Sequence, residues 1–250
     1  MSRTMISGEN RFVFVAPMYN ASATLDQCLA SLVGQSYKNW KIILIDDVSD
    51  QHEVMKEAEI IRRWRPMCYS GGMQIVDVWN DEKKWEVANV LHGISMCEPN
   101  DIVCRMDADD WLTELDALCM LNAAYTQMKC DCLWTAHRWG FSDKNISGPM
   151  SDGTDPYKHP WVSSHLKTFR KSLIDGVNDQ NFRGEDGSYI RRAGDQAIYL
   201  PVLQHAQKRL FVPRVMYHYT IDDVPETYQT DDARFQRDEA LFLRARGYVQ

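Results

Sequence analysis

Three aspartates within four residues are the densest group of chemically useful side chains in the sequence: Asp107, Asp109 and Asp110. They directly follow residues 101–106, whose apolar composition predicts a buried strand. Carboxylates this close repel one another unless a cation or hydrogen-bond donors compensate their charge. A hard divalent cation, Mn²⁺ or Mg²⁺, suits such oxygen ligands and would keep positions open for a diphosphate. The alternative is an acidic helix start that Asp109 or Asp110 only caps.

A polar loop also follows the first apolar run of the chain. Residues 12–16 predict a buried strand that stops at Pro17, and Tyr19 and Asn20 come directly after it. Proline ends the ladder pairing of a strand. An aromatic ring beside an amide could wall the pocket of a nucleobase, so these residues are candidates for nucleotide binding.

The second apolar run, residues 41–45, leads into Asp46 and Asp47, and Ser49 follows. A carboxylate at this strand end could accept hydrogen bonds from a nucleobase edge or a ribose hydroxyl. The alternative is a structural turn that Ser49 closes.

Strand-like and helix-like patterns alternate around these loops. Strands are predicted at 12–16, 41–45, 74–79 and 101–106, and helices at about 24–33, 52–64 and 87–94. Pro66 is expected to close the second helix, and Thr113 with Asp116 resembles a capping box that opens a fourth. This alternation predicts an α/β fold with a mostly parallel central sheet and helices on both faces. Ligands of such sheets lie beyond the carboxyl ends of the strands, so the three polar loops should converge on one crevice.

The second half of the chain is organised differently. Residues 140–160 are rich in Gly, Ser, Asp and Pro without any period, which predicts a long loop. A strand near 166–169, a helix from 195 to about 207, a strand at 211–220 and a charged helix at about 232–246 are expected after it. We expect residues 1–250 to form one domain with two halves, at about 10–135 and about 136–250.

Composition restricts the classes of partner. The chain has 28 Lys+Arg and 35 Asp+Glu, so its net charge of −7 argues against a nucleic acid or an anionic membrane as a general partner. The seven cysteines lack a paired framework, as is typical of reduced, buried thiols. The apolar runs are too short to cross a bilayer. These features predict a soluble, cytoplasmic protein whose membrane contact, if any, is peripheral.

Together, the three loop motifs resemble family 2 of the glycosyltransferases, which have the GT-A fold. Residues 15–20 are similar to that family's opening strand and loop, residues 35–50 to its second block, and residues 106–112 to its metal block. In residues 83–89, only Ala88 and Asn89 match the third block. The resemblance implies a metal-dependent, inverting transfer from a nucleotide-sugar, with a UDP-sugar the expected donor and a carbohydrate or other hydroxyl compound the acceptor.

The resemblance also implies roles for individual residues. Pro17, Tyr19 and Asp47 would contact the nucleoside, and Asp107 would contact the ribose or the water shell of the metal. Asp109 would coordinate Mg²⁺ or Mn²⁺ bridging the diphosphate. Three more residues of the matching blocks complete the expected nucleotide- and sugar-binding set: Asn20, Asn89 and Ala108.

Two functions are expected from the second half. In the strand at 211–220, His218 could be a further metal ligand, and Asp222 is the alternative ligand. His218 could also be a packed, hydrogen-bonded residue without a role in metal binding. An inverting transferase needs a base at the acceptor hydroxyl. By the resemblance this is Asp195, at a predicted helix start, with Asp186 beside Glu185 as the rival.

Two further residues are candidates for the sugar pocket. Trp161 and His165 could line it, because aromatic and imidazole groups suit the faces and hydroxyls of sugars.

Two other function classes compete. A nucleotidyltransferase also uses strand-end aspartates, a metal and a nucleotide, but it is expected to carry a glycine-rich, basic loop after its first strand. From Pro17 to Ser36 the chain has one glycine and no Lys or Arg. A non-catalytic sugar- or nucleotide-binding domain on the same fold is the second alternative. The presence of Asp107, Asp109 and Asp195 argues against it.

Overall fold

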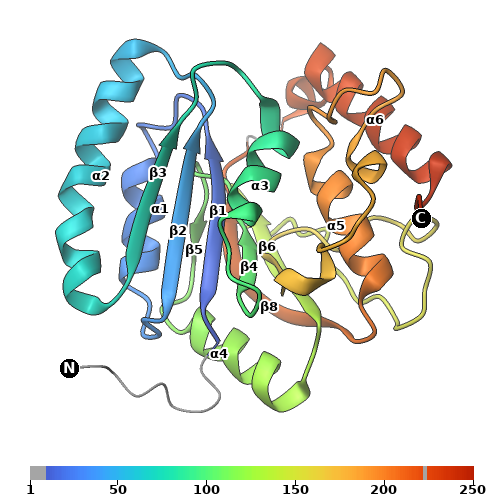
Figure 1. The fold of residues 1–250 in the computed structure, drawn as a ribbon, viewed down its shortest axis with the longest axis horizontal. Coiled ribbons are helices and arrows are strands. Elements are labelled where there is room, and N and C mark those ends of the chain that lie inside the picture. The colour runs from blue at the N-terminus through green and yellow to red at the C-terminus, as the bar shows by residue number, and fades with distance from the viewer. Residues whose placement is uncertain (1–9, 222–223) are drawn as a thin grey trace.

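An eight-stranded sheet, in the order β3-β2-β1-β4-β7-β6-β8-β5, forms the centre of the computed structural model, which describes residues 10–221 and 224–250 (Figure 1). The strands are β1 (Phe12–Met18), β2 (Trp40–Asp46), β3 (Gln74–Trp79), β4 (Ile102–Arg105), β5 (Trp111–Leu112), β6 (Cys132–Trp139), β7 (Lys167–Arg170) and β8 (Arg209–Tyr219). β1 pairs in parallel with β2 and β4, β2 with β3, and β6 with β8. β7 is antiparallel to β4 and β6, and β5 is antiparallel to β8. The predicted mostly parallel sheet is confirmed.

Helices cover both faces of this sheet. They are α1 (Leu25–Val33), α2 (Gln51–Gly71), α3 (Trp85–Ser95), α4 (Ala117–Ala123), α5 (Gly194–His205) and α6 (Asp231–Arg246). Shorter helical segments are η1 (Ala124–Met128), η2 (Lys171–Leu173), η3 (Asp179–Phe182) and η4 (Pro225–Tyr228).

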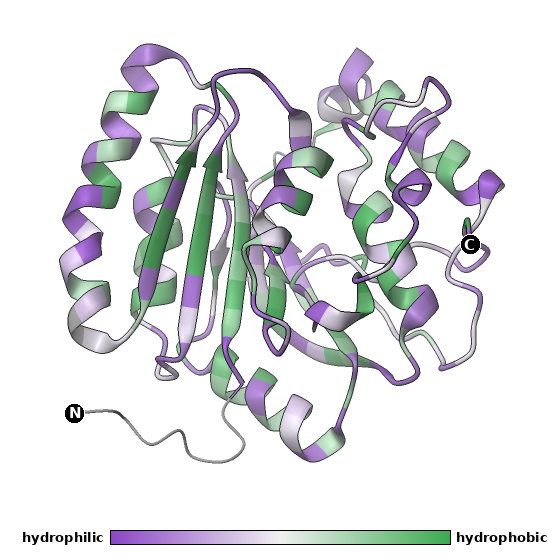
Figure 2. Ribbon diagram, viewed as in Figure 1, coloured by the Kyte–Doolittle hydropathy of each residue, from purple (hydrophilic) through white to green (hydrophobic). Residues whose placement is uncertain are grey.

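The strands bury both of their faces because successive side chains point to opposite sides. Phe12 and Phe14 of β1 belong to the core shared with α1, α2 and α4, whereas Val13 and Val15 belong to the core shared with α3, α5 and α6. Every residue of β2 is buried. Figure 2 shows these strands largely in the colours of apolar residues, whereas α2 at the left edge is mostly polar. This two-sided burial explains why the strand sequences are continuous apolar runs.

The register of the strands brings the polar loops to one edge of the sheet. Met18 is aligned with Asp46 between β1 and β2, and Val15 is aligned with Arg105 between β1 and β4. The loops after β1, β2 and β4 therefore converge, as the sequence predicts. β8 reaches the same place from the second half, because Trp111 in β5 pairs with His218 in β8.

Two boundary predictions are wrong. α2 does not stop before Pro66 but continues to Gly71. Pro66 is exposed, so water can satisfy the backbone carbonyl that loses its helical partner. Thr113 and Asp116 form no capping box: Thr113 Oγ1 donates to the carbonyl of Val215 and so extends the β5–β8 pairing. The helix begins only at Ala117, and the Asp116 side chain makes no cap hydrogen bond.

The sequence also predicts the long loop between β6 and β7 and apolar runs that are too short to cross a bilayer. Between β6 and β7, the described residues 140–166 contain neither helix nor strand, which confirms the predicted long loop. Within residues 10–221 and 224–250, no helix is both long enough and apolar enough to cross a membrane.

We predict that Gly93→Val destabilises the fold. A Cβ atom at Gly93 would lie 2.4 Å from Val15 Cγ1 and 3.1 Å from Ile45 Cδ1, so α3 would be pushed off the sheet. Overpacking of this kind costs about 1–3 kcal/mol in unfolding free energy, measurable by urea denaturation. The matched control is His92→Val on the exposed side of the same helix, expected to change stability by less than about 0.5 kcal/mol. Equal stability of the two variants would contradict the close packing of α3.

Candidate functional site

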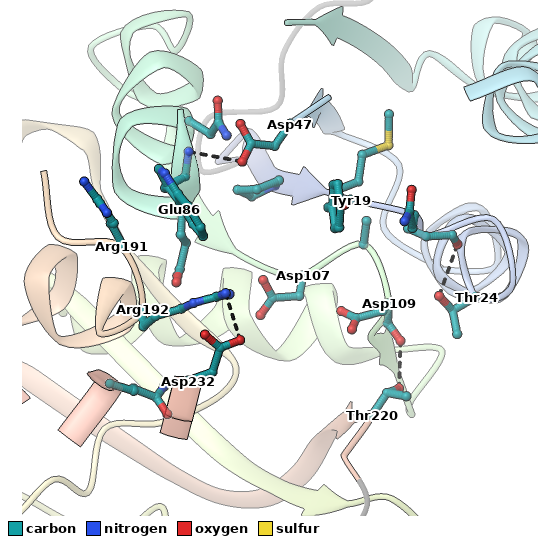
Figure 3. Close-up of a pocket in the computed structure, with 18 of the residues that line it drawn as sticks. Tyr19, Thr24, Asp47, Glu86, Asp107, Asp109, Arg191, Arg192, Thr220 and Asp232 are labelled. Carbon is teal, nitrogen blue, oxygen red and sulfur yellow. Dashed lines mark hydrogen bonds and ion pairs between the residues drawn. The ribbon is translucent and has the colours of Figure 1, made fainter. Parts of the chain in front are cut away.

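A crevice of about 850 Å³ opens at the edge of the sheet where β1, β2 and β4 end (Figure 3). Eight of the predicted site residues line it: Pro17, Tyr19, Asn20, Asp47, Asn89, Asp107, Ala108 and Asp109. The second half of the chain adds Arg191 and Arg192 from the loop before α5 and Asp232 at the start of α6, and Thr220, after β8, lies beside Asp109. Both halves of the chain therefore contribute to one crevice.

A buried arginine organises the acidic side of the crevice. Arg105 ends β4 with its side chain 3% exposed. Its Nη2 donates to Glu86 Oε1 and to Asp107 Oδ1, both at 2.7 Å. Burial raises the pKa of Glu86 to about 7, against the effect of Arg105, and the charges of Asp195 and Asp107 add to the increase. Arg105 thus fixes the spacing of two crevice carboxyls that come from different elements.

The remaining two aspartates of the cluster differ in environment. Asp110 is fully buried, and its carboxylate accepts hydrogen bonds from Tyr217 Oη and from the backbone N–H of Thr220, both at 2.7 Å. Burial and the charges of Asp107 and Asp109 raise its pKa well above the usual range. Asp109 keeps exposed surface, yet desolvation in the crevice and the charge of Asp107 raise its pKa to about 6.

The electrostatic interactions link five carboxyl groups, those of Glu86, Asp107, Asp109, Asp110 and Asp195. Among the described residues, two buried cations form ion pairs with these carboxylates. Arg105 pairs with Glu86 and Asp107, and Lys167 pairs with Asp195. The group is therefore short of positive charge. Burial is the main cause of the raised pKa values of Glu86, Asp109 and Asp110, and repulsion from neighbouring carboxylates adds to it.

Two of these carboxyl groups, together with His165, also meet a geometric requirement for metal binding. Asp107, Asp110 and His165 each bring one ligand atom to within 4.8 Å of the others. Of the three, Asp107 lines the crevice, whereas Asp110 and His165 are buried behind it. The sequence singled out Asp110 within the acidic motif but gave His165 only a place in the sugar pocket.

At the other end of the crevice, Tyr19 and Lys83 lie beside Asp47. Lys83 Nζ is 3.5 Å from the centre of the Tyr19 ring and 3.9 Å from Asp47 Oδ2. The Asp47 carboxylate accepts backbone hydrogen bonds from Lys84 at 2.7 Å and Trp85 at 3.1 Å. Asp47 therefore anchors the start of α3 as well as lining the crevice.

The two predicted asparagines have different surroundings. Asn20 joins two loops, because its backbone N–H donates to Ser49 Oγ and its side chain exchanges hydrogen bonds with Asp50. Asn89 is fully buried at the wall of the crevice. Its Oδ1 accepts from Asn80, whereas its Nδ2 has no hydrogen-bond partner among the described residues. A buried donor without a partner at a crevice wall is available to a ligand.

Asp195 lies in the first turn of α5, as the sequence predicts, but it does not line the crevice directly. Lys167 Nζ is 2.7 Å from its Oδ1, and His165 Nε2 is 3.8 Å from its Oδ2. Burial favours the neutral acid, but the charges of Lys167, His165 and Arg105 hold the pKa of Asp195 well below its usual range. Asp195 is therefore ionised at neutral pH.

Glu86 lines the crevice beside the start of α5. A Cβ atom added at Gly194 would meet the carboxyl carbon of Glu86 at 2.3 Å, so this carboxyl group lies against the first residue of α5. The sequence gave no signal for Glu86, because it is 108 residues from Gly194. The Glu86 carboxyl group fits there only because Gly194 has no side chain.

The remaining candidates lie outside the crevice. His165 is 4% exposed and stacks on Tyr217 and Tyr219, with ring centres 4.9 Å and 4.6 Å apart. Trp161 packs against the core on the α5 side of the sheet. Asp186 lies in an exposed turn, where it accepts hydrogen bonds from Ser188.

His218 is also separate from the carboxylate cluster. Its ring stacks on Trp111 at 3.7 Å, and its Nδ1 accepts a hydrogen bond from Arg138 Nε at 3.2 Å. It does not line the crevice. The alternative ligand, Asp222, lies outside the described residues.

A carboxylate of α6 fixes the loop that carries Arg191 and Arg192. Glu239 Oε1 accepts from the N–H of Arg191 at 2.9 Å, and its Oε2 accepts from Arg192 at 2.7 Å and Ala193 at 3.0 Å. This loop leads directly into α5. Glu239 therefore ties the C-terminal helix to the wall of the crevice and to the start of the helix that carries Asp195.

Comparisons with known proteins agree with this fold and motif set. The sequence matches glycosyl transferase family 2 over residues 13–196. It is 37% identical over 99 residues to the amylovoran biosynthesis glycosyltransferase AmsB of Erwinia amylovora, a match that spans 40% of this chain and 31% of that protein. The chain thus covers less than a third of this curated relative.

Solved structures share the fold. Residues 1–349 of S. aureus TarS, in complex with UDP-GlcNAc, have a TM-score of 0.63 at 15% identity, covering 88% of this chain and 61% of that one. The mannosyltransferase PcManGT of Pyrobaculum calidifontis, in complex with GDP-Man and Mn²⁺, has a TM-score of 0.56 at 14% identity, covering 94% and 73%. The fold is therefore of the GT-A type, and the chain belongs to glycosyl transferase family 2.

We predict that Glu239→Ala loosens the crevice wall. Three backbone N–H groups would lose their acceptor, which costs about 1–3 kcal/mol in local stability. Hydrogen exchange measured by mass spectrometry should therefore accelerate in peptides that contain residues 191–193. Asp238→Ala, at the exposed neighbouring position of α6, is the control and should leave exchange unchanged. Equal exchange in both variants would mean that Glu239 does not hold this loop.

Proposed function

We propose that this protein is a metal-dependent, inverting glycosyltransferase that transfers a sugar from a UDP-sugar to a hydroxyl group of a carbohydrate acceptor. The observation that carries the proposal is the cation-deficient carboxylate cluster, which lies at the strand ends inside the crevice of a family 2 chain. In this account residues 10–135 bind the donor, and residues 136–250 provide the acceptor side and the base.

The nucleoside is assigned to the end of the crevice near β1 and β2. Tyr19 is 52% exposed there and offers a ring face for a nucleobase, provided that Lys83 moves aside. Asp47 has both carboxylate oxygens engaged by backbone N–H groups but keeps lone pairs for a ribose or base donor. The ligands of TarS and PcManGT, UDP-GlcNAc and GDP-Man, support a nucleotide-sugar as the donor.

The metal is assigned to Asp109 and Asp107, because both line the crevice and the charge of the cluster is not balanced without a cation. Oxygen ligands of this kind suit Mn²⁺ or Mg²⁺. When bound, the cation would offset the charge that builds up on the departing nucleoside diphosphate. Asp110 supports the site from behind, where Tyr217 and Thr220 fix its carboxylate. His218 is not needed as a ligand in this arrangement.

The base is assigned to Asp195. Lys167 keeps it ionised and holds its orientation, so it can accept the proton of an acceptor hydroxyl. The same ion pair makes it a weak base. Glu86 is therefore the alternative, because it lines the crevice and its pKa is about 7, close to the value that favours proton transfer at neutral pH.

The competing functions predict different products. A nucleotidyltransferase would release pyrophosphate from a nucleoside triphosphate. A binding domain would leave a UDP-sugar intact. A transferase is expected to hydrolyse a UDP-sugar slowly when no acceptor is present, with release of UDP.

We predict that Asp109→Asn abolishes Mn²⁺-dependent binding of UDP while the protein melts at a similar temperature. The amide removes a full negative charge from the metal site but fits the same space. Binding is measured by calorimetric titration of UDP with and without Mn²⁺. The control is Asp116→Asn, the same change at an exposed aspartate that does not line the crevice. Normal UDP–Mn²⁺ affinity in Asp109→Asn would refute the metal assignment.

We predict that Asp195→Asn lowers turnover by about 10²–10⁴-fold, the usual contribution of a positioned acid–base group, with UDP affinity retained. Because Lys167 is 1% exposed, this variant leaves a buried cation without its anion and should also be less stable. Turnover is therefore measured well below the melting temperature of the variant, with Asp186→Asn as control.

The outcome for Glu86 decides between the two candidate bases. If Asp195→Asn turns over normally while Glu86→Gln does not, the base is Glu86. Retention of the anomeric configuration in the product would exclude the single-base mechanism for either residue.

A further inference from the structure

A second hollow, of about 410 Å³, adjoins the crevice, and four of the nine residues that line it carry aromatic rings. We call it the aromatic hollow; its lining includes Trp111, Trp139, Phe141, Ser142, His218 and Thr220. Thr220 also lines the crevice, where its hydroxyl donates to the carbonyl of Asp109 at 2.7 Å (Figure 3). The aromatic hollow therefore lies beside the site where we propose that sugar transfer takes place, with Thr220 between the two.

His218 lines this hollow, although only 1% of the residue is exposed. Arg138 Nε can only donate, so His218 Nδ1 must accept their 3.2 Å hydrogen bond. Burial and the charge of Arg138 lower the pKa of His218, so the ring is neutral and carries its proton on Nε2. Among the described residues, Nε2 has no hydrogen-bond partner. The stack on Trp111 holds the ring in place.

Phe141 is the most exposed large apolar side chain of the described chain, at 94%. Its ring meets His218 edge-on, with ring centres 5.4 Å apart. Trp139 lies beside it, and its ring packs edge-on against Tyr219 at 5.8 Å. Aromatic rings exposed around a hollow next to an active site usually mark a binding surface.

We propose that the aromatic hollow binds a sugar unit of the glycan acceptor, next to the unit that receives the transferred sugar. A sugar ring has a flat face of C–H groups, which packs on aromatic rings, and a rim of hydroxyls, which need hydrogen-bond partners. The hollow supplies both: Phe141 for the face, because Lys144 Nζ already lies 4.1 Å from the centre of the Trp139 ring, and His218 Nε2–H with the hydroxyl of Thr220 for the rim. This inference rests on the proposed function, because it takes the crevice as the transfer site.

The position of the hollow beside the crevice favours a glycan over other apolar ligands. A chain of linked sugars whose terminal unit reacts in the crevice must leave it on the acceptor side, and Thr220 is the residue common to both spaces. The acceptor is therefore expected to have at least two sugar units, and a monosaccharide should bind more weakly.

The test is binding of the purified protein to an array of neutral oligosaccharides of two to six units, followed by titration of the best binder. We expect the parent protein to bind at least one of them. Phe141→Ala should weaken this binding roughly tenfold, because it removes one apolar platform. Phe141→Tyr, which keeps the ring, should restore it. Tyr69→Ala, which removes a similarly exposed aromatic from α2, is the matched control and should bind as the parent does.

Binding of UDP–Mn²⁺ to the same samples separates this inference from the proposed function. Phe141→Ala is expected to lose glycan affinity and to keep UDP–Mn²⁺ affinity. A parent protein that binds UDP–Mn²⁺ but none of the glycans, or a Phe141→Ala variant with undiminished glycan affinity, would overturn the inference. A parent that binds glycans through Phe141 but never binds UDP would overturn the proposed donor site instead.

Discussion

Mutual repulsion among carboxylates is the constraint on which the crevice depends. Parallel strands deliver Asp107, Asp109 and Asp110 to one sheet edge, and the cost of gathering these charges is met by what surrounds them. Arg105 bonds Glu86 and Asp107 through one nitrogen, and Tyr217 and Thr220 hydrogen-bond to Asp110. This compensation is incomplete, and the remaining negative charge is the basis for the cation site that we propose.

The second half of the chain completes the cluster by long-range contacts. β8 supplies Tyr217 and Thr220 behind the acidic loop, and β7 supplies Lys167, the buried partner of Asp195. α6 holds the loop before α5 through Glu239. The strand-end aspartates and Asp195, which come from separate parts of the sequence and to which we assign the metal and the base, are thus linked by ion pairs and backbone hydrogen bonds. Motion of α6 would alter both sides of the crevice together.

The sequence was sufficient for features that depend on neighbouring residues. Continuous apolar runs predict the parallel strands, and the strand-end motifs predict which loops meet. The contacts of Glu86 with Gly194 and of Glu239 with the loop before α5 join residues far apart in the chain, so no local pattern indicates them. The two wrongly predicted helix boundaries also depend on the surroundings in the fold. α2 continues through Pro66 because this part of the helix is exposed to water, and Thr113 pairs with β8 instead of capping a helix.

The central claim is that the crevice binds a nucleoside diphosphate through a cation held by the strand-end aspartates. The most direct measurement is a crystal structure with UDP and Mn²⁺, recorded with anomalous scattering from manganese. The account predicts one strong anomalous peak at coordination distance from Asp109, bridging to the diphosphate, with the uracil beside Tyr19. A structure with UDP bound in the crevice and no manganese at Asp109, or with UDP bound elsewhere, would contradict it.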